Sequence, residues 1–495
     1  MENGANWIHG QFDDNYCDDE GRNCGNHTTR EFMNSMWKYQ QKFYGTIRHM
    51  DGSFTDYNSL KVMYQNGSQL PDKDIDECWD QIIEAEDTCS ELNEEPDMTI
   101  RNCYEKHINL TGLNEKICKS FIWEEVEFET AIFNASLKHN IPLNGRGNHP
   151  YNDRDYLVTD PRGYQYIMEA ISEDFSTSII FNQKVNEIKH SEQGVQVITE
   201  NGTKIDADYA ICTVSLGVLQ SNFIKFDPDF DDKKKKAISR LEMGFYAKIY
   251  VTFPKNVWKD DEVLMYVSED QEPHESIMTW CLNLDHPKYF KGSKMLTCHS
   301  MGPTAKRIES QTTTETKDEV NKIMAHMFRG EQEVDRTVEN IHVTSWSNNS
   351  LFYGAYSDVP VGVTQQELDL VKKNVGRLYF AGEHTADNKG FVHSAYDSGK
   401  NVSALIIADM RDTSGIPSKI PSKIPHKTPT TTSTTRDEAT TPTSKKTPTT
   451  STTNDTRSTS SNGNRFESSI LFKVISFVLT YLCTILYLSN NITEQ

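Results

Sequence analysis

The chain has 495 residues, with 51 Lys and Arg against 72 Asp and Glu, so its formal net charge is −21, and 36% of its residues are hydrophobic. This length allows roughly two to four domains and a sizeable core. The acidic balance argues against a protein whose main task is to neutralise nucleic-acid phosphates, because that task needs clustered Lys and Arg. A cationic small-molecule substrate fits the charge better, although acidity by itself also keeps a protein soluble.

The N-terminal part of the chain is rich in cysteine. Six of the ten cysteines fall in a polar, acidic stretch with few long apolar runs. No CxxC pair or His-rich cluster accompanies them, so we expect no zinc or other metal site. We expect disulfides of an oxidising compartment instead, with the pairing left open. The six are Cys17, Cys24, Cys78, Cys89, Cys103 and Cys118.

Sequons of the form Asn-x-Ser/Thr are frequent and give modest support for N-glycosylation, because chance matches are common in a chain rich in Asn, Ser and Thr. Together with the cysteines they favour a secretory route. Met1 leads directly into Glu-Asn-Gly-Ala-Asn-Trp without a signal peptide, which we interpret as a missing N-terminus. The sequons begin at Asn26, Asn66, Asn109, Asn134, Asn201, Asn348, Asn401, Asn454 and Asn491.

Residues 156–225 have the pattern of an α/β unit. Helical apolar spacing predicts a helix over Tyr164–Phe175. Alternating or continuous apolar runs predict four strands, and Asn201-Gly202 between two of them predicts a tight hairpin turn. The predicted strands are Ser178–Phe181, Val185–Lys189, Val195–Thr199 and Tyr209–Val214.

Two later segments carry features that bear on chemistry. Residues 242–253 predict another strand with Lys248 inside it, and a lysine in an apolar strand is costly unless it faces water or a partner. Residues 377–385 predict a short strand that breaks at a glycine turn, and an apolar helical run follows from Gly390 through Ile407. A strand, a turn and a helix N-terminus together form a natural anion site.

The C-terminal segments predict attachment to a membrane. Residues 411–465 are rich in Pro, Thr, Ser and Lys, so we expect a disordered, O-glycosylated stalk. Residues 466–495 contain an apolar run, Val474–Leu488, placed as in a GPI-attachment signal. The polar end Ser489–Gln495 departs from that pattern, and a single transmembrane helix over Ile470–Leu488 is the alternative. Either alternative predicts tethering at the extracellular face of the plasma membrane.

Four ordered blocks of the sequence resemble those of the flavin-dependent amine oxidases, and most closely the polyamine oxidase branch. The first contains Gly4-Ala5-Asn6-Trp7 and resembles the early substrate-proximal motif, and the last contains Ala381-Gly382-Glu383 and resembles the flavin-binding signature. The resemblance runs from residue 1 to about residue 409, with 66–120 as a divergent insertion, and four blocks in order are far more specific than one Gly-rich match. The blocks are residues 2–10, 245–249, 346–362 and 377–399.

The resemblance implies a mixed α/β fold with a discontinuous FAD-binding domain and a substrate-binding domain. It implies noncovalent FAD, because no cysteine lies just before Arg377 or within Phe391–Gly399, where covalent relatives carry theirs. The Gly-x-Gly-x-x-Gly fingerprint and its βαβ unit do not occur in the chain, and one N-terminal truncation would explain this and the missing signal peptide. The expected FAD-binding segments are 1–10, 156–225 and 376–410, and the expected substrate-binding segments are 11–155 and 226–375.

The resemblance also implies roles for individual residues. Lys248 matches the lysine that holds a water against flavin N5, and Glu383 matches the acid that binds the ribityl–pyrophosphate part of FAD. Each candidate also has an ordinary explanation, such as a helix-capping acid, an edge-strand lysine or a core aromatic. The expected FAD contacts are Val185, Trp346, Gly382, Glu383 and Val392, and the expected substrate contacts are His9, Glu127, Phe128, Tyr246, Tyr356 and Phe391.

The implied reaction is oxidation of a polyamine such as spermine, spermidine or an acetylated form. The neutral amine passes a hydride from its α-carbon to flavin N5, water hydrolyses the imine to an aminoaldehyde and a shorter amine, and O2 reoxidises the flavin to give hydrogen peroxide. We expect no nucleic-acid partner and leave the oligomeric state open. The alternative is a cofactor-free surface protein that uses the scaffold for adhesion or binding. An L-amino-acid oxidase would need an arginine for the substrate carboxylate, and the sequence indicates no candidate for it. A histone demethylase would be nuclear, which disagrees with the predicted stalk and tail.

Overall fold

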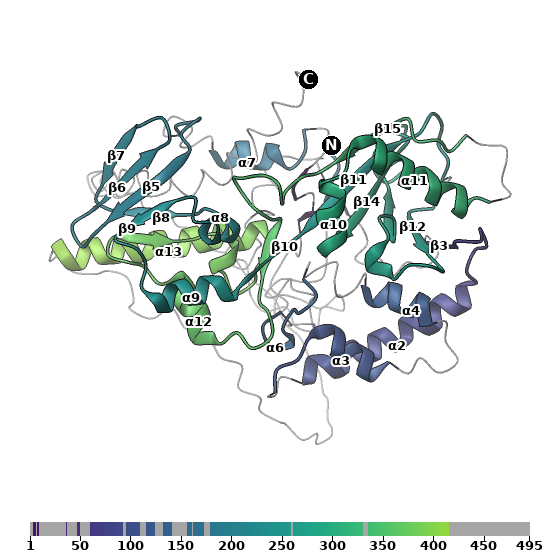
Figure 1. Cartoon of the computed structure of the whole chain (residues 1–495), viewed down its shortest axis with the longest axis horizontal. Coiled ribbons are helices and arrows are strands. Elements are labelled where there is room, and N and C mark those ends of the chain that lie inside the picture. Colours follow the sequence, from purple (N-terminus) through teal and green to yellow (C-terminus); the bar gives the residue numbers. More distant parts are fainter. Residues whose placement is uncertain are drawn as a thin grey trace, which may run out of the picture.

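The structure is a computed structural model in which helices and strands gather into two lobes (Figure 1). We call them the large-sheet lobe, made of the described residues of 60–140 and 246–343, and the parallel-strand lobe, made of those of 179–241 and 363–414. This mixture of helix and sheet confirms the predicted fold class. The residues described are 3–5, 7–8, 36, 47–49, 60–92, 96–108, 115–123, 132–140, 156–160, 162–172, 179–258, 261–329 and 335–414.

The large-sheet lobe is built on a six-stranded sheet in the order β15-β11-β14-β13-β12-β3. Neighbouring strands are antiparallel except β12 and β3, which are parallel. Both faces are buried, because alternate side chains such as Val263 and Leu264 enter two different cores. The strands are β3 (Leu60–Tyr64), β11 (Tyr246–Thr252), β12 (Val263–Val267), β13 (Trp280–Asn283), β14 (Met295–Met301) and β15 (Asn340–Val343).

Helices cover both faces of this sheet. One core contains residues of α2, α3 and α4, and these three helices lie together along the lower edge of the lobe in Figure 1. The other core contains residues of α10 and α11. The elements are α2 (Asp72–Glu91), α3 (Ile100–His107), α4 (Glu115–Ile122), α6 (Leu137–Asn140), η5 (Pro273–Glu275), α10 (Gly302–Glu309) and α11 (Thr313–Met327).

Disulfides cross-link this lobe. Cys78–Cys118 joins α2 to α4, and Cys89–Cys103 joins α2 to α3. These two confirm the disulfides expected of four N-terminal cysteines, whereas Cys17 and Cys24 lie outside the described residues. A third disulfide, Cys281–Cys298, joins β13 to β14 and was not predicted.

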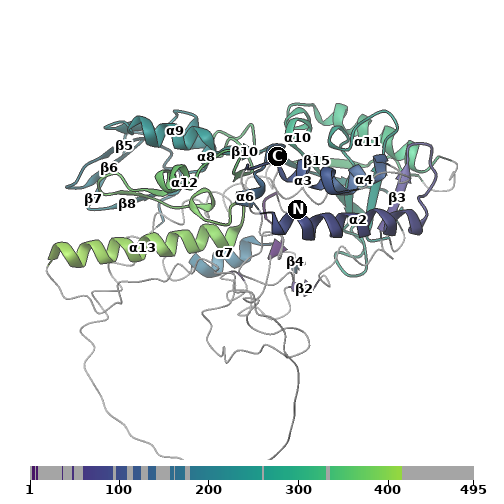
Figure 2. The same cartoon turned by 90° about the horizontal axis from the view of Figure 1, so that it is seen from below.

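The parallel-strand lobe contains a four-stranded sheet, β7-β6-β5-β9, and a two-stranded parallel sheet of β8 and β17. The long helix α13 runs along one side of this lobe (Figure 2). Its core also takes in α9 and α12, which the sequence-based division assigns to the substrate-binding domain, and the domain boundaries stay a prediction. The elements are β5 (Val185–His190), β6 (Val195–Thr199), β7 (Lys204–Ala207), β8 (Ala210–Cys212), α8 (Leu216–Gln220), β9 (Lys225–Asp227), α9 (Asp232–Arg240), α12 (Gln365–Lys372), β17 (Leu378–Phe380), η6 (Glu383–Thr385) and α13 (Val392–Ser414).

Two small sheets complete the described fold. One is antiparallel and pairs the N-terminal strand β1 with β4, which also pairs with β2. The other pairs β10 with β16 between the two lobes (Figure 1). The remaining elements are β1 (Trp7–Ile8), β2 (Ile47–His49), β4 (Tyr156–Val158), α7 (Gln165–Ser172), β10 (Glu242–Gly244) and β16 (Tyr356–Asp358).

Several local predictions are confirmed and two strand predictions are wrong. The Asn201-Gly202 turn exists, but it joins β6 to β7, a strand that the sequence did not indicate. Residues 242–253 form two strands rather than one, because β10 pairs with β16 while β11 pairs with β14 and β15. Residues 179–181 form no strand, and the left-handed residue Asn182 (φ 58°) follows them.

The C-terminal predictions lie mostly outside the described residues. Helix α13 continues to Ser414, so the first residues of the predicted stalk, 411–414, are helical. Within the part of the chain that the structure describes, no helix combines the length and apolar character needed to cross a bilayer. The predicted tail, residues 466–495, falls outside that part.

Candidate active site

Strand β11 presents Lys248 on the face of the large sheet that also carries two tyrosines. Because side chains alternate along a strand, Tyr246, Lys248 and Tyr250 share one face, while Ile249 points to the opposite core. Lys248 is only 6% exposed. Its backbone N–H donates to Thr344 Oγ1 (2.8 Å), and its backbone oxygen accepts from Thr344 N (3.0 Å). The strand therefore holds the lysine in a fixed position.

Residues of the N-terminal segment contact this lysine and its neighbours. Lys248 Nζ donates to the carbonyl oxygen of Gly4. Trp346 Nε1 donates to the carbonyl oxygen of Asn3 (3.0 Å), and His342 Nε2 lies 2.8 Å from Asn3 Oδ1. The ring of Trp346 lies against Gly4, where an added Cβ would come within 3.6 Å of it. Lys248 and Trp346, two of the predicted site residues, thus meet through the chain's first described residues.

An aromatic wall lies next to the lysine. The ring centroids of Tyr246 and Tyr356 are 6.0 Å apart. The ring of Tyr356 packs against Gly390, where an added Cβ would lie 3.2 Å from it, and Gly390 has a φ of 82° that favours glycine. The next residue, Phe391, stacks on His393 with centroids 5.2 Å apart. The structure therefore gathers three of the predicted substrate contacts around one turn.

His299 belongs to this site and was missed by the sequence analysis. It is the cross-strand partner of Lys248 in the β11–β14 pair and is 2% exposed. Its Nδ1 lies 2.6 Å from the hydroxyl oxygen of Tyr246. Burial, and then the charge of Lys248, lower the pKa of His299 well below its ordinary value, so the ring is neutral. A histidine within the mixed segment 295–301, Met-Leu-Thr-Cys-His-Ser-Met, was the available signal.

The turn after β17 buries Glu383, which connects two parts of the site. Its Oε2 accepts from Ser357 Oγ (2.8 Å) and from the backbone N–H of Gly390 (2.9 Å). Burial raises the pKa of Glu383, while the hydrogen bonds from Ser357 and Gly390 oppose that rise. The carboxylate fastens the strand carrying Tyr356 to the turn that precedes α13. Its predicted contact with FAD stays a prediction.

Further charged and polar groups lie around Glu383, of which Asp358 and His384 are buried and Lys389 is partly buried. Burial raises the pKa of Asp358 well above its ordinary value, and burial lowers the pKa of Lys389 although Glu383 and Asp358 oppose this. Burial also lowers the pKa of His384 to about 3, so its ring stays neutral. No hydrogen-bond partner of His384 Nε2 occurs among the described residues. A buried polar nitrogen without a partner is costly, and a bound molecule or a water can supply the missing hydrogen bond.

The glycine turn fits a large polar cofactor such as FAD. Gly382 has a φ of 124°, which favours glycine, and its N–H donates to Ser398 Oγ (2.9 Å). The turn leads into the N-terminus of α13 at Val392, so backbone groups, neutral His384 and a helix end lie close along the chain. The residues present therefore fit the group that the sequence implies.

Other predicted contacts lie elsewhere or outside the described residues. Val185 begins β5 and packs on the core of the parallel-strand lobe, whereas Val392 packs on a separate core that contains α7. His9, Glu127 and Phe128 fall outside the described residues. Their roles stay predictions.

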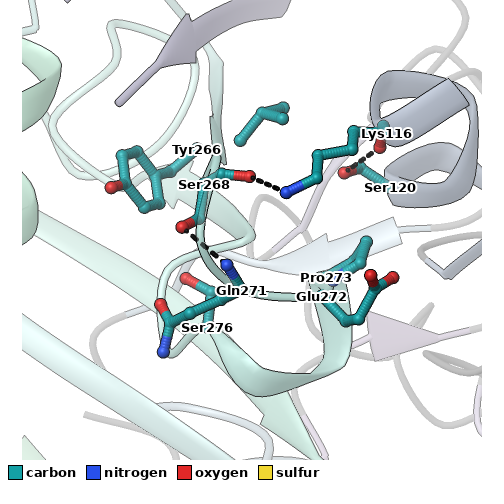
Figure 3. Close-up of a pocket in the computed structure, with 9 residues that line it drawn as sticks. Lys116, Ser120, Tyr266, Ser268, Gln271, Glu272, Pro273 and Ser276 are labelled. Atoms are coloured by element: carbon teal, nitrogen blue, oxygen red, sulfur yellow. Dashed lines mark hydrogen bonds between the residues drawn. The ribbon is translucent and has the colours of Figure 1, made fainter. Parts of the chain in front are cut away.

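A small pocket elsewhere in the large-sheet lobe is not part of this site. It lies between α4 and the segment after β12 and has room for about one water molecule. Figure 3 shows Lys116 reaching across it to the backbone oxygen of Ser268 (3.3 Å). The pocket contains none of the predicted site residues.

The buried lysine, the aromatic wall and the glycine turn before a long helix lie at positions where the sequence resembles the flavin-dependent amine oxidases. The family model described as flavin containing amine oxidoreductase matches residues 1–407. The chain belongs to this family and is an FAD-dependent amine oxidase. Of the two alternatives that the sequence left open, the enzyme is therefore supported over the cofactor-free binding protein.

Individual relatives place the chain near the polyamine oxidases, as predicted. Polyamine oxidase 1 of Zea mays is 29% identical over 435 residues, which cover 82% of this chain and 80% of that protein. Polyamine oxidase 7 of Oryza sativa subsp. japonica is 33% identical over 279 residues, which cover 54% of this chain and 57% of that protein. The structure of cyclohexylamine oxidase from Brevibacterium oxydans IH-35A matches with a TM-score of 0.54 at 15% identity, covering 71% of this chain and 81% of that one, and so shares the fold.

Proposed function

We propose that this enzyme oxidises polyamines such as spermine, spermidine or their acetylated forms at a carbon next to nitrogen. The products would be an aminoaldehyde, a shorter amine and hydrogen peroxide. The proposal rests on the position of Lys248, which is buried in β11 beside Tyr246 and hydrogen-bonded to the carbonyl of Gly4. The similarity to plant polyamine oxidases supports the substrate class.

The proposed substrate path follows the aromatic wall. The rings of Tyr246 and Tyr356 suit a guest with methylene groups and a cationic nitrogen, because aromatic faces attract both. Phe391, and beyond the described residues His9, Glu127 and Phe128, would extend this path. The net charge of −21 raises the local concentration of polycations around the protein.

Lys248 and its neighbours would organise the reacting nitrogen. The ammonium of Lys248 would hold a water or the amine at a fixed place, and neutral His299 adds no second positive charge to repel the substrate. The turn at Gly382–Glu383, with Trp346, Val185 and Val392, would hold the cofactor noncovalently. When bound, FAD supplies the hydride-accepting chemistry and the reaction with O2.

We also propose a secretory route with a membrane tether at the C-terminus. Three disulfides support an oxidising compartment, since disulfides are rare in reducing ones. The predicted stalk and apolar tail would attach the enzyme to the outer face of the plasma membrane.

The test is the visible absorbance of the purified chain after incubation with FAD, before and after anaerobic addition of spermine. Loss of the oxidised-flavin spectrum with spermine and spermidine, but not with cyclohexylamine, is the expected result. The variant Lys248→Met should keep the flavin spectrum and lose most of the rate of bleaching. Bleaching by cyclohexylamine alone would overturn the polyamine assignment.

A further inference from the structure

Five of the sequons lie in the described part of the chain, and the structure separates them into two kinds. Two have the sequence Asn-Gly-Ser or Asn-Gly-Thr and lie at Asn66 and Asn201. The other three begin at Asn134, Asn348 and Asn401. The sequon pattern treats all five alike, although the Asn-Gly pair of the first two is also a turn signal.

Asn66 lies at the end of a tight turn after β3. The turn is closed by the N–H of Gly67 donating to Tyr64 O (2.9 Å), and Gly67 has a φ of 86°. Asn66 Oδ1 accepts both from the backbone N–H of Ser68 (2.8 Å) and from its hydroxyl (2.7 Å). Asn66 and Ser68 are both exposed.

Asn201 lies in a turn with the same hydrogen-bond pattern, in the other lobe. The N–H of Gly202 donates to Thr199 O (2.9 Å), and Gly202 has a φ of 84°. Asn201 Oδ1 accepts from the backbone N–H of Thr203 (3.1 Å) and from its hydroxyl (2.8 Å), and, unlike Asn66 Oδ1, it also accepts from the hydroxyl of Thr199 (2.6 Å). Asn201 and Thr203 are both exposed. Two unrelated positions in the chain thus adopt one local arrangement.

The other three sequons lack this arrangement. Ser136, the hydroxyl residue of the first, is completely buried and donates to Asp97 (2.8 Å). The side-chain nitrogen of Asn348 donates to the backbone oxygen of Glu309 (3.1 Å). Asn401 lies inside α13, where the hydroxyl of Ser403 donates to Gly399 O (2.8 Å). In each of these sequons the hydroxyl or the side-chain amide makes a hydrogen bond outside the sequon, and the third sequon lies within a helix.

We propose that Asn66 and Asn201 are the N-glycosylation sites of the described part of the chain. In both turns the oxygen of the side-chain amide is held by the hydroxyl and the backbone N–H, so Nδ2 points away from these contacts at an exposed tip. Donation to Oδ1 also draws electron density from the amide and eases loss of a proton from Nδ2. The proposal rests on the proposed secretory route and is independent of the polyamine chemistry.

The reaction requires a sugar carried on a polyprenyl diphosphate. Nδ2 bonds to the anomeric carbon, the bond from that carbon to the phosphate oxygen breaks, and its electron pair leaves with the diphosphate. One amide proton passes to a base or to water. The result is a neutral, bulky and solvated group at each turn.

A glycan at Asn201 would also protect the sheet next to it. β7 is an edge strand of the four-stranded sheet, and three of its four side chains are exposed. Exposed edge strands can pair with other chains, and proteins commonly cover or blunt them. A glycan at the turn that begins β7 would hinder such pairing.

The test is site-by-site occupancy in the full chain expressed behind a secretory leader. Glycopeptide mass spectrometry, with enzymatic deglycosylation in heavy-oxygen water, marks each occupied asparagine as a labelled aspartate. We expect Asn66 and Asn201 to be occupied in most molecules and Asn134, Asn348 and Asn401 in few. Mapping the Cys78–Cys118 disulfide in the same digest shows that the molecules folded in the oxidising compartment.

Matched variants sharpen the result. Asn66→Gln and Asn201→Gln should each remove one glycan from the intact mass, whereas Asn401→Gln should remove none. Thr203→Val deletes the hydroxyl at nearly constant shape and should empty Asn201, while Ser68→Thr should keep Asn66 occupied. The proposal would be overturned if Asn66 and Asn201 carried no glycan in molecules that contain the Cys78–Cys118 disulfide. It would also be overturned if glycan occupancy at Asn401 equalled that at Asn66 and Asn201. Spermine-dependent bleaching of the deglycosylated enzyme is measured separately and tests only the proposed activity.

Discussion

Both lobes bury a lysine, and the two lysines have different surroundings. In the parallel-strand lobe, Lys234 is 2% exposed and lies 4.0 Å from the centroid of the Phe380 ring. Its ammonium donates to the last carbonyls of α12, groups that a helix end leaves unpaired. The three acceptors are the oxygens of Leu370 (2.9 Å), Val371 (2.8 Å) and Lys373 (2.7 Å). This lysine fastens one helix to another.

In the large-sheet lobe, Lys248 lies among side chains that can contact a substrate. Its neighbours are the carbonyl of Gly4, neutral His299 and the ring of Tyr246, which in turn packs near Tyr356. Burial of a lysine therefore does not by itself identify a catalytic group. The groups around the ammonium distinguish a structural lysine from one placed for chemistry.

The lobes also differ in their covalent links. All three disulfides among the described residues lie in the large-sheet lobe. The one free cysteine of that described part, Cys212, lies in β8 of the other lobe, and burial raises its pKa to about 11. A buried thiol of raised pKa is unreactive. Disulfides thus stabilise the large-sheet lobe, which carries Lys248 and the aromatic wall. Packing and the hydrogen bonds of Lys234 stabilise the parallel-strand lobe.

The largest expected effect comes from Lys248→Met, which tests the assignment of roles to the two lysines. We expect the rate of flavin reduction by spermine to fall about 10²–10⁴-fold, because a positioned side chain that assists proton transfer typically contributes that much. The free energy of unfolding should fall by only about 1 kcal/mol, because Met fills a similar volume and one side-chain hydrogen bond, to the carbonyl of Gly4, is lost. Stopped-flow absorbance under anaerobic conditions measures the rate. An unchanged rate would contradict the role of Lys248.

Removal of one disulfide should weaken the large-sheet lobe selectively. The double variant Cys78→Ala/Cys118→Ala opens a sequence separation of 40 residues and Cys89→Ala/Cys103→Ala one of 14. Loop-closure entropy predicts losses of about 4 and about 3 kcal/mol in the free energy of unfolding. Hydrogen exchange resolved by lobe is the measurement. Equal loss of protection in both lobes would show that the disulfides stabilise the whole chain rather than one lobe.

Lys234→Met should have the opposite outcome to Lys248→Met. It leaves three helix-end carbonyls without their donor, so we expect a loss of about 2–3 kcal/mol in the free energy of unfolding. The rate of flavin reduction per bound flavin should stay within about twofold, since no substrate contact is proposed in this lobe. Urea unfolding followed by tryptophan fluorescence measures the first quantity. A large loss of rate without a loss of stability would reverse the assignment of the two lysines.

The pH dependence of stability tests the neutral histidine of the β17 turn. Burial lowers the pKa of His384 to about 3, whereas the unfolded chain has its ordinary value of 6.5. Between these values the unfolded state binds the extra proton, so the free energy of unfolding falls as the pH decreases, by about 1.4 kcal/mol per pH unit. His384→Gln should flatten this slope. Urea unfolding at about pH 7 and about pH 5 compares the two proteins, and equal slopes would show that His384 is not the group responsible.

The smallest effect is expected for the hydrogen bond between Tyr246 and His299. Tyr246→Phe removes the hydroxyl 2.6 Å from His299 Nδ1 and should cost about 1 kcal/mol of unfolding free energy. His299→Leu added to the Tyr246→Phe variant should then cost less than in the wild type, because the two residues share one bond. A double-mutant cycle by urea unfolding measures this coupling. Additive effects would exclude a shared hydrogen bond.

Local patterns predicted the elements whose formation depends on a few neighbouring residues. The strands β5, β6 and β17, the turn at Asn201-Gly202 and the helix after Gly390 follow from periodicity and turn chemistry. The strand predicted over 242–253 was wrong in one respect, because the apolar run continues across Phe245 while the pairing partner changes from β16 to β14. An apolar run indicates burial and does not record which strand lies beside it.

The sequence by itself determined the family and the cofactor class, because ordered motifs carry that information along the chain, and it singled out Lys248 and Glu383 as candidate site residues. Only the tertiary structure decided that His299 faces Lys248, that Asn3 and Gly4 close over the site, and which cysteines are joined. It also separated the two sequons in tight turns from the other three. The position of His299, the contacts of Asn3 and Gly4 and the disulfide pairing depend on strand register and on contacts between separate segments of the chain, and hydrophobic pattern and local propensity do not encode either.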